Sequence, residues 1–292
     1  MKFGIPALLA FLAVPSIASA QDPPPPPEQD IPATVVVPRF TAFFAAVGGR
    51  IEADEASFPA PILDGSSVHF DSDLDVDDSV PTWIAEIVAY RREGGRYSEW
   101  LSVSWLESSY EGSTTFDSTE TFNGRTFAAG SVVDSKLHYR SWGVDYTVTE
   151  GETPLENTWA AFTLGARYTD FRVQLESAAG ETDERLRLLY LGGGFRGETH
   201  WGGWLSGVIK ASVYFSFGGY DDPWDLEYQE WGGVIFEGQA GVNVTLGVLN
   251  LEGGWRYLSN SSYAHTDSSD KFEDNDFLLE LSGPYASVTF RF

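Results

Sequence analysis

The sequence of 292 residues contains no cysteine, one methionine, and only 18 lysines and arginines against 43 aspartates and glutamates. Without cysteine, disulfides, thiolate metal sites and a lipid-modified cysteine anchor are excluded. The shortage of basic residues argues against nucleic acid, whose phosphates require basic patches. It argues equally against attachment to anionic headgroups from the membrane surface. After the first 20 residues no run of about 18 apolar residues occurs, so no membrane helix is predicted there.

Aromatic residues, in contrast, are abundant: they make up 15% of the chain, with 10 tryptophans and 13 tyrosines. Such an excess is typical of membrane proteins with aromatic girdles at both interfaces. In an exported protein, this aromatic and acidic composition would indicate the outer membrane of a Gram-negative bacterium.

The first 37 residues predict export followed by a linker. An apolar stretch at 7–17 precedes Ala18-Ser19-Ala20, a small-x-small cleavage site, so residues 1–20 are predicted to be a cleaved signal peptide. The alternative is a membrane anchor, for which the stretch is too short. Residues 21–37 include the run Pro23 to Pro27, which favours extended polyproline geometry. We expect a periplasmic linker there, or a proline-rich partner-binding segment.

The final residues predict a membrane strand. From Ala286 to Phe292, apolar residues alternate with Ser287, Thr289 and Arg291. One apolar and one polar face suit a barrel with lipid outside and a polar lumen. The alternation changes phase near Gly283-Pro284, which predicts a bulge. Beyond the bulge we expect a second lipid-facing set: Phe277, Leu279 and Leu281. A terminal strand of this kind resembles the signal read by the outer-membrane insertion machinery, so we expect that machinery as an assembly partner.

Strand-like alternation recurs along the chain. The predicted strands are 38–51, 82–92, 96–110, 132–148, 157–175, 184–197, 203–217, 232–246, 249–260 and 277–292. Short connections lie at 93–95, 149–156, 198–202 and 247–248, and long, acidic ones at 52–81, 111–131, 218–231 and 261–276. The connection 176–183 is the exception, since it is shorter but still polar. Short turns on one side and long loops on the other are typical of bacterial outer-membrane barrels.

The predicted fold is therefore all-β: a transmembrane antiparallel up-and-down β-barrel of ten strands over residues 38–292. Eight or twelve strands would satisfy the same even parity. A soluble β-sandwich is the competing architecture, and it explains neither the signal peptide nor the asymmetry of the connections.

Four stretches carry a resemblance to a known group. They are the acidic segment Phe70 to Ser79, the stretches Thr121 to Gly130 and Ser135 to Tyr146, and the closing Gly283-Pro284-Tyr285 with Phe290-Arg291-Phe292. In these the chain resembles a group of ten-stranded outer-membrane β-barrel proteins of Gram-negative bacteria, generally without assigned function. The resemblance implies a fold and a membrane, and it brings no catalytic residues.

If the polar strand faces point inward, the lumen contains four acids and four bases. They are Glu86, Asp145, Arg167, Arg196, Lys210, Glu237, Glu252 and Arg256. Because side chains can largely fill so narrow a barrel, we predict an ion-paired network that plugs the lumen. A narrow polar conduit and an interior ligand site are the alternatives. Wide diffusion pores use about 16–18 strands and are disfavoured.

Acidic side chains in the connections are the weaker candidates. The run Asp71, Asp73, Asp75 and Asp77 would place carboxylates on one face of an extended segment, where a divalent cation could bind. A solvated acidic loop is the favoured interpretation. The remaining outer-loop acids either keep the loops soluble or share divalent cations with lipopolysaccharide. Lipid and lipopolysaccharide are the expected partners, and no cofactor is expected.

Candidates for catalysis are few. The histidines are His69, His138, His200 and His265. A serine, histidine and aspartate arrangement could be drawn only from His265, Asp267 and Ser259, Ser261 or Ser262. The segment 260–265 is predicted to be a loop, whereas such sites need a rigid scaffold. The sequence thus favours a structural or interaction role, or a narrow channel. An outer-membrane lipid A or phospholipid hydrolase, or an omptin-like protease, is the alternative.

Overall fold

The computed structural model describes residues 34–57, 67–71, 73–76, 80–93, 97–122, 125–150, 158–222, 227–267 and 271–290. They belong to one unit, Ala33–Phe292. The predicted signal peptide and residues 21–33 of the predicted linker lie outside them. Within the described ranges no helix is long and apolar enough to span a bilayer.

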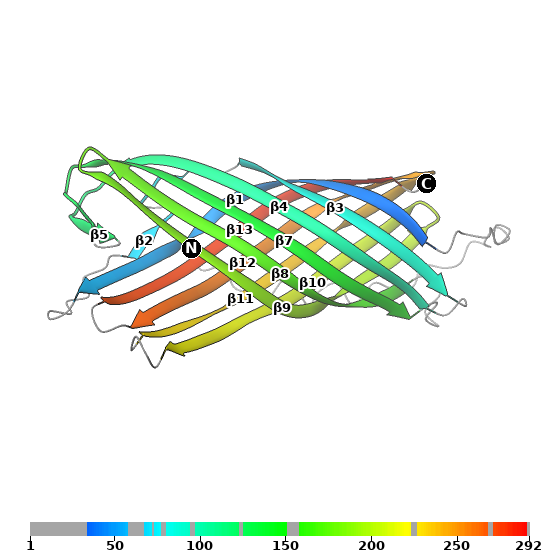
Figure 1. The fold of residues 1–292 in the computed structure, drawn as a ribbon. Coiled ribbons are helices and arrows are strands. Elements are labelled where there is room, and N and C mark those ends of the chain that lie inside the picture. Colours follow the sequence, from blue (N-terminus) through cyan, green and yellow to red (C-terminus); the bar gives the residue numbers. More distant parts are fainter. Residues whose placement is uncertain are drawn as a thin grey trace. The chain divides into compact units, whose positions relative to one another are not determined.

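Ten long described strands close into an antiparallel barrel (Figure 1). They are β1 (Thr34–Ser57), β3 (Val80–Glu93), β4 (Tyr97–Thr115), β7 (Val132–Glu150), β8 (Thr158–Ser177), β9 (Gly180–Gly202), β10 (Leu205–Asp222), β11 (Glu227–Leu246), β12 (Leu249–Asp267) and β13 (Lys271–Phe290). Each pairs with the next in this order, and β13 pairs with β1 to close the ring. The predicted all-β, ten-stranded barrel is confirmed, and β1 already begins at Thr34.

Three short strands accompany the barrel. β2 (Ser67–His69) pairs with residues 50–52 of β1. β5 (Glu120–Phe122) and β6 (Arg125–Phe127) form a hairpin in the connection between β4 and β7. Both inserts carry fully buried apolar side chains, which belong to the same core cluster as residues of the long strands: Val68, Phe70, Leu74, Phe122 and Phe127.

The long strands extend well into the connections predicted from the sequence. β10 and β11 continue to Asp222 and from Glu227, so the predicted loop 218–231 is mostly strand. The same holds for 261–276, because β12 runs to Asp267 and β13 starts at Lys271. At 176–183 the connection narrows to the turn Ala178-Ala179. These stretches are rich in polar residues, and a strand of polar composition is easily taken for a loop in the sequence.

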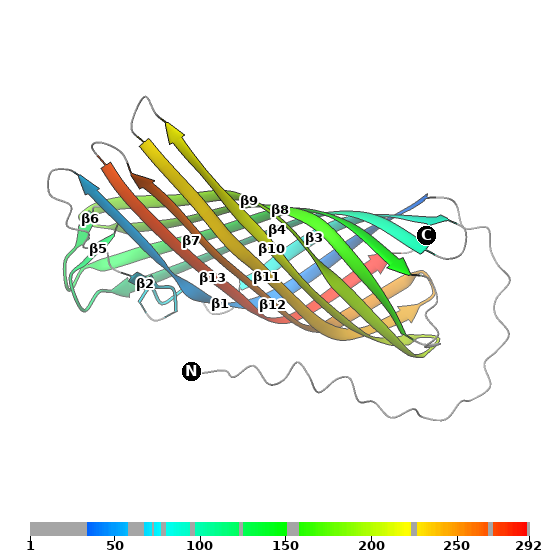
Figure 2. The ribbon, with the colours of Figure 1, turned by 90° about the horizontal axis from the view of Figure 1, so that it is seen from below.

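Among the residues whose exposure the structure describes, the apolar exterior lies mainly over one half of the barrel. We call this half the proximal half; it contains the end of the barrel at which β1 begins and β13 ends (Figure 2). The opposite half is called the distal half. Outward side chains of the proximal half include Phe40, Ile87, Val144, Phe162, Leu164, Leu191, Phe215 and Trp255, all exposed. On β8 this surface runs from Ala160 to Tyr168, close to the roughly nine to eleven residues that a tilted strand needs to cross a bilayer. Aromatic rings at its distal edge include Trp83, Trp142 and Tyr168.

In the distal half the two faces exchange character. Outward positions of β8 change from Leu164 and Tyr168 to Asp170 and Arg172, while inward positions change from Thr163 and Arg167 to Phe171 and Val173. The strand keeps its register throughout. The proximal half thus has lipid-type packing, and the distal half has the apolar interior and polar surface of a water-soluble protein.

This exchange explains why the predicted bulge at Gly283-Pro284 is wrong. β13 pairs with β12 in one unbroken register from Phe272 to Phe290. The β1–β13 ladder omits the positions around Pro284, which has no N–H, and then resumes in register. Phe277, Leu279 and Leu281, predicted to face lipid, lie inside the barrel with exposed fractions of 3%, 1% and 0%. The surroundings of β13 change along its length, but the alternation of inward and outward positions continues without a break.

Candidate functional site

The candidate site is the charged interior of the proximal half. All eight side chains predicted for the lumen point inward there, and at most 24% of any of them is exposed. They are Glu86, Asp145, Arg167, Arg196, Lys210, Glu237, Glu252 and Arg256. They come from seven strands, and each occupies an inward position in the alternation of its strand.

Arg167 on β8 lies at the centre of the first group. Its NH1 and NH2 donate to the two carboxylate oxygens of Asp145 at 2.7 and 2.8 Å, and its Nε donates to Oε1 of Glu237 at 3.1 Å. NH2 also donates to the hydroxyl of Tyr214 at 2.7 Å. The second oxygen of Glu237 lies 3.6 Å from Arg256 and 4.0 Å from Lys210. The Arg167 guanidinium is therefore shared by the buried carboxylates of Asp145 and Glu237, and Arg256 and Lys210 add positive charge beside Glu237.

Two glycines make room for this group. In the β7–β8 register Asp145 lies opposite Gly165, and Arg167 lies opposite Gly143. A Cβ atom at Gly165 would lie 2.0 Å from Oδ1 of Asp145, and one at Gly143 would lie 2.6 Å from NH1 of Arg167. The two charged side chains therefore meet diagonally across the space that the missing side chains leave.

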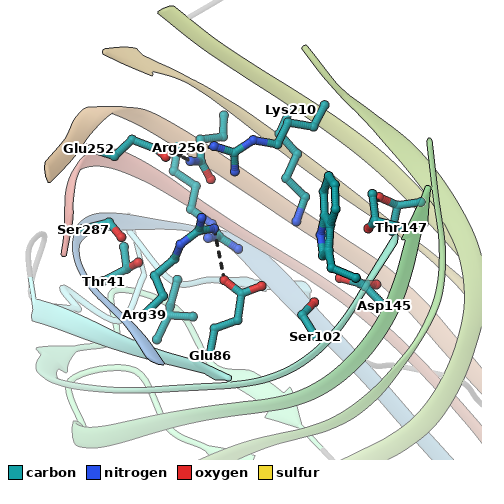
Figure 3. Close-up of a pocket in the computed structure, with 15 residues that line it drawn as sticks. Arg39, Thr41, Glu86, Ser102, Asp145, Thr147, Lys210, Glu252, Arg256 and Ser287 are labelled. Carbon is teal, nitrogen blue, oxygen red and sulfur yellow. Dashed lines mark hydrogen bonds and ion pairs between the residues drawn. The ribbon is translucent and has the colours of Figure 1, made fainter. Parts of the chain in front are cut away.

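Two further ionic groups line the same interior (Figure 3). Arg196 lies 3.2 Å from Glu252 and 3.7 Å from Glu198, and Tyr285 donates to Glu252 at 2.8 Å. Arg39 pairs with Glu86 at 3.2 Å, and Figure 3 shows this contact beside Ser102 and Asp145. The side chains leave a polar cavity of about 60 Å³ between the groups and a second of about 40 Å³ toward Arg167. Each has room for only a few water molecules.

Arg39 and Glu198 were not predicted from the sequence, and with them the interior contains five acids and five bases, still in balance. β1 looked irregular because its inward positions change from Arg39 and Thr41 to Phe43 and Ala45 within a few residues. Glu198 falls in a segment predicted to be a turn, although β9 continues to Gly202. Both residues would have been predicted to point inward if the strict alternation of each strand had been continued beyond its apolar stretch.

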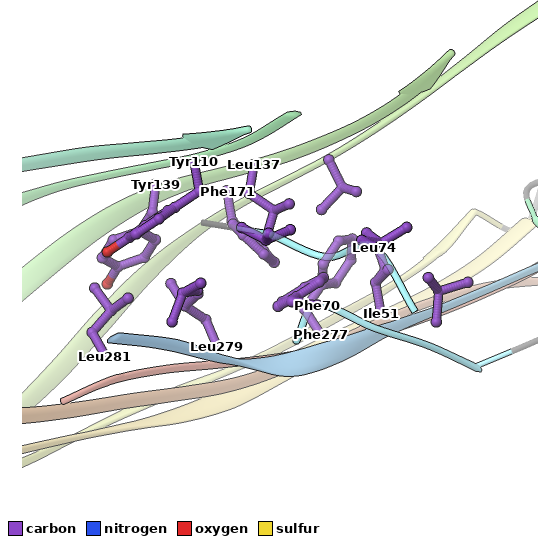
Figure 4. Close-up of a cluster of buried hydrophobic side chains, with 14 of the residues drawn as sticks. Ile51, Phe70, Leu74, Tyr110, Leu137, Tyr139, Phe171, Phe277, Leu279 and Leu281 are labelled. Carbon is purple, nitrogen blue, oxygen red and sulfur yellow. The ribbon is translucent and has the colours of Figure 1, made fainter. Parts of the chain in front are cut away.

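Apolar side chains fill the interior of the distal half (Figure 4). Tyr139, Phe171, Phe277 and Leu281 from the barrel wall pack with Phe70 from the segment after β2. The ring of Phe171 lies 5.2 Å from that of Phe277, 6.1 Å from Phe70 and 6.3 Å from Tyr139, each pair near edge-to-face. This arrangement is favourable for aromatic rings. The interior thus changes from ionic to apolar along the barrel axis.

The acidic run after β2 does not adopt the extended conformation predicted for it. Residues around Asp71 and Asp73 form a turn, in which Asp73 accepts a hydrogen bond from the backbone N–H of His69 at 2.8 Å. Asp75 has a left-handed φ of 48°. Asp77 lies outside the described residues. No described group of three or more histidine, aspartate or glutamate side chains is arranged to hold a metal ion.

The serine and histidine arrangement near residue 265 is not formed by the fold. Residues 260–265, predicted to be a loop, belong to β12. Ser262 points inward and hydrogen-bonds Tyr190, whereas His265 is on the outward face of the strand. Ser259 and Ser261 share that outward face, but residues four or more positions apart on an extended strand are separated by roughly 13 Å or more, which is too far for a hydrogen bond. His138 is outward on β7, 3.4 Å from Glu107; His200 lies 3.9 Å from Glu198; and His69 is exposed.

No family model matches the chain, and no curated protein matches it. Among solved structures it is similar to the outer membrane protease OmpT from Escherichia coli, at 8% identity and a TM-score of 0.46, over 88% of this chain and 96% of that one. It is similar to the transport unit of the autotransporter AIDA-I from Escherichia coli, at 8% identity and a TM-score of 0.41, over 91% and 93%. The translocator domain of the autotransporter NalP from Neisseria meningitidis follows, at 13% identity and a TM-score of 0.39, over 90% of each chain.

Proposed function

We propose that this protein is an integral outer-membrane barrel with a closed lumen and a structural or interaction role. The ionic network closes the proximal half, and the apolar core closes the distal half. Polar outer strands and acidic connections then present a water-facing surface beyond the membrane. We also propose that it belongs to the ten-stranded outer-membrane group it resembles, and that it is exported through a cleaved signal peptide and inserted by the outer-membrane machinery.

The observation that carries the proposal is the apolar core of the distal half. An ion that crossed the barrel would have to pass the packed rings of Phe70, Phe171 and Phe277, which offer it no polar group. Such a passage is costly, because a charge in an apolar environment loses its hydration without compensation. The proximal network supports the same conclusion, since its charges are paired with one another and few are left to coordinate a passing solute.

Conductance in a planar bilayer tests this proposal. The purified barrel is expected to show no discrete openings, and so is Lys210→Glu, which reverses one charge of the network. Arg50→Glu makes the same change at an exposed outward position of β1 and is the matched control. Openings in the wild type that become more cation-selective in Lys210→Glu, and not in Arg50→Glu, would refute the closed lumen and favour the narrow conduit.

A further inference from the structure

Basic residues gather on one side of the barrel's outer surface. Of the chain's 18 lysines and arginines, five point outward from three adjacent strands, just beyond the apolar surface. They are Lys136 and Arg140 on β7, Arg172 on β8, and Arg185 and Arg187 on β9. The four arginines form what we call the arginine patch. On the next strand, β4, the acid Glu107 lies directly opposite Arg140. The cations are therefore concentrated on one side of a strongly acidic protein.

The cross-strand register fixes the layout of this patch. Asp170 on β8 has Arg140 directly opposite on β7 and Arg187 directly opposite on β9. One step farther along, Arg172 lies opposite Arg185. One step in the other direction, Trp142, Tyr168 and Leu189 form a row of exposed apolar side chains. A row of arginines thus adjoins a row of rings that suits the membrane interface.

The acidic residues in the patch orient the arginines without using all their donors. Asp170 accepts from Arg185 with both oxygens, one at 2.6 Å from Nε, while the Nε of Arg187 lies 3.6 Å away. Arg172 donates to Asp183 at 2.7 Å, and Arg140 donates to Glu107 at 2.8 Å. Three carboxylates thus hold the four guanidiniums by hydrogen bonds or ion pairs, and Glu181 adds a fourth negative charge near Arg172. The arginine side chains are 40 to 50% exposed, so N–H groups remain available toward the solvent or the membrane.

We infer that the arginine patch binds a phosphate group of lipid A in the outer leaflet. Guanidinium forks match the oxygens of a phosphate in geometry and charge. The adjoining row of Trp142, Tyr168 and Leu189 offers apolar surface where the acyl chains of the same molecule begin. A ligand with phosphate above and hydrocarbon below fits both rows, whereas a soluble anion fits only the first. The inference rests on the proposed outer-membrane location, with the distal half facing outward.

The test is a titration of the purified, folded barrel in non-ionic detergent with bisphosphorylated lipid A, with fully dephosphorylated lipid A, and with phosphatidylglycerol. The wild type is expected to bind the bisphosphorylated form most tightly. Arg140→Gln combined with Arg187→Gln should weaken that binding about twenty-fivefold, because each cation at an anionic lipid surface contributes roughly fivefold. Asp170 keeps its hydrogen bonds to Arg185 in this variant, so the fold is retained.

Arg50→Gln is the matched control, because Arg50 is exposed on β1, which β3 and β4 separate from β7. It should leave lipid A binding unchanged. Equal binding by the double variant, an equal loss in Arg50→Gln, or equal binding of dephosphorylated lipid A or phosphatidylglycerol would each refute the site. Conductance plays no part in this titration: a conducting barrel that binds lipid A refutes only the closed lumen, and a closed barrel that does not bind it refutes only this site.

Discussion

Arg167 illustrates how a charge can be buried inside a membrane barrel. Its guanidinium is 5% exposed and donates hydrogen bonds to Asp145, Glu237 and Tyr214. The Tyr214 hydroxyl in turn donates to Asp145 at 3.1 Å, and the Tyr214 ring lies 4.3 Å from the guanidinium carbon. Each loss of hydration is compensated by a defined partner, which is the condition under which buried charges are tolerated. The group is therefore expected to respond sharply to the loss of one member.

Arg167→Gln should lower the free energy of unfolding by about 3–5 kcal/mol, because it leaves two buried carboxylates without their shared cation. Arg172→Gln makes the same change on the same strand at a 42% exposed side chain, where loss of the Asp183 pair should cost at most about 1 kcal/mol. Denaturant unfolding in detergent, followed by tryptophan fluorescence, measures both. Equal losses would mean that the proximal interior is hydrated like the surface.

The partners within this network could not be read from the sequence. Alternation along each strand is a local pattern, and it predicted that Asp145, Arg167 and Glu237 point inward. Which acid meets which base depends on the offset between neighbouring strands, and Arg167 lies opposite Gly143 and reaches Asp145 only diagonally. That offset is set by the whole closed sheet. For the same reason, the sequence did not show that Gly143 and Gly165 leave space for the side chains of Arg167 and Asp145.

At the scale of a strand, the exchange of faces limits what hydropathy can predict. Apolar side chains avoid water, but the pattern does not say on which side of the strand the water lies. In the proximal part of β13 water is absent outside, so Ala286 and Val288 point outward; in the distal part it is present outside, so Leu279 and Leu281 point inward. If apolar side chains are assumed to face outward along the whole strand, a bulge is needed to explain the change in alternation. The continuous register shows that none is needed.

Adjacent leucines of β13 test this account. Leu279→Gln should lower the free energy of unfolding by about 3 kcal/mol or more, because a polar amide replaces an apolar side chain in a packed apolar core. Leu278→Gln changes the neighbouring residue on the outward face, and its cost should stay within about 1 kcal/mol. The same denaturant titration applies. A larger loss in Leu278→Gln than in Leu279→Gln would restore the phase change that the alternation first indicated.

At the scale of the whole barrel, the two halves perform different tasks within one sheet. The proximal half matches the length of a bilayer and keeps its charges inside. The distal half continues the same strands beyond the apolar surface, with the inserts at β2 and at β5–β6 packed into its core. Its cross-strand pairs on the outer face, such as Arg172 with Asp183, are those of a protein in water. A rigid extension of this kind would hold the connections at a fixed distance from the membrane.

The direction of this extension is testable because the chain has no cysteine of its own. Ala179→Cys places a thiol at the exposed turn between β8 and β9, and Val248→Cys places one at the 62% exposed turn between β11 and β12. On intact cells a membrane-impermeant maleimide should label only the Ala179 variant, and the Val248 variant should react once the outer membrane is permeabilised. The reverse pattern would place the distal half in the periplasm. The arginine patch would then face the inner leaflet, where lipid A is absent.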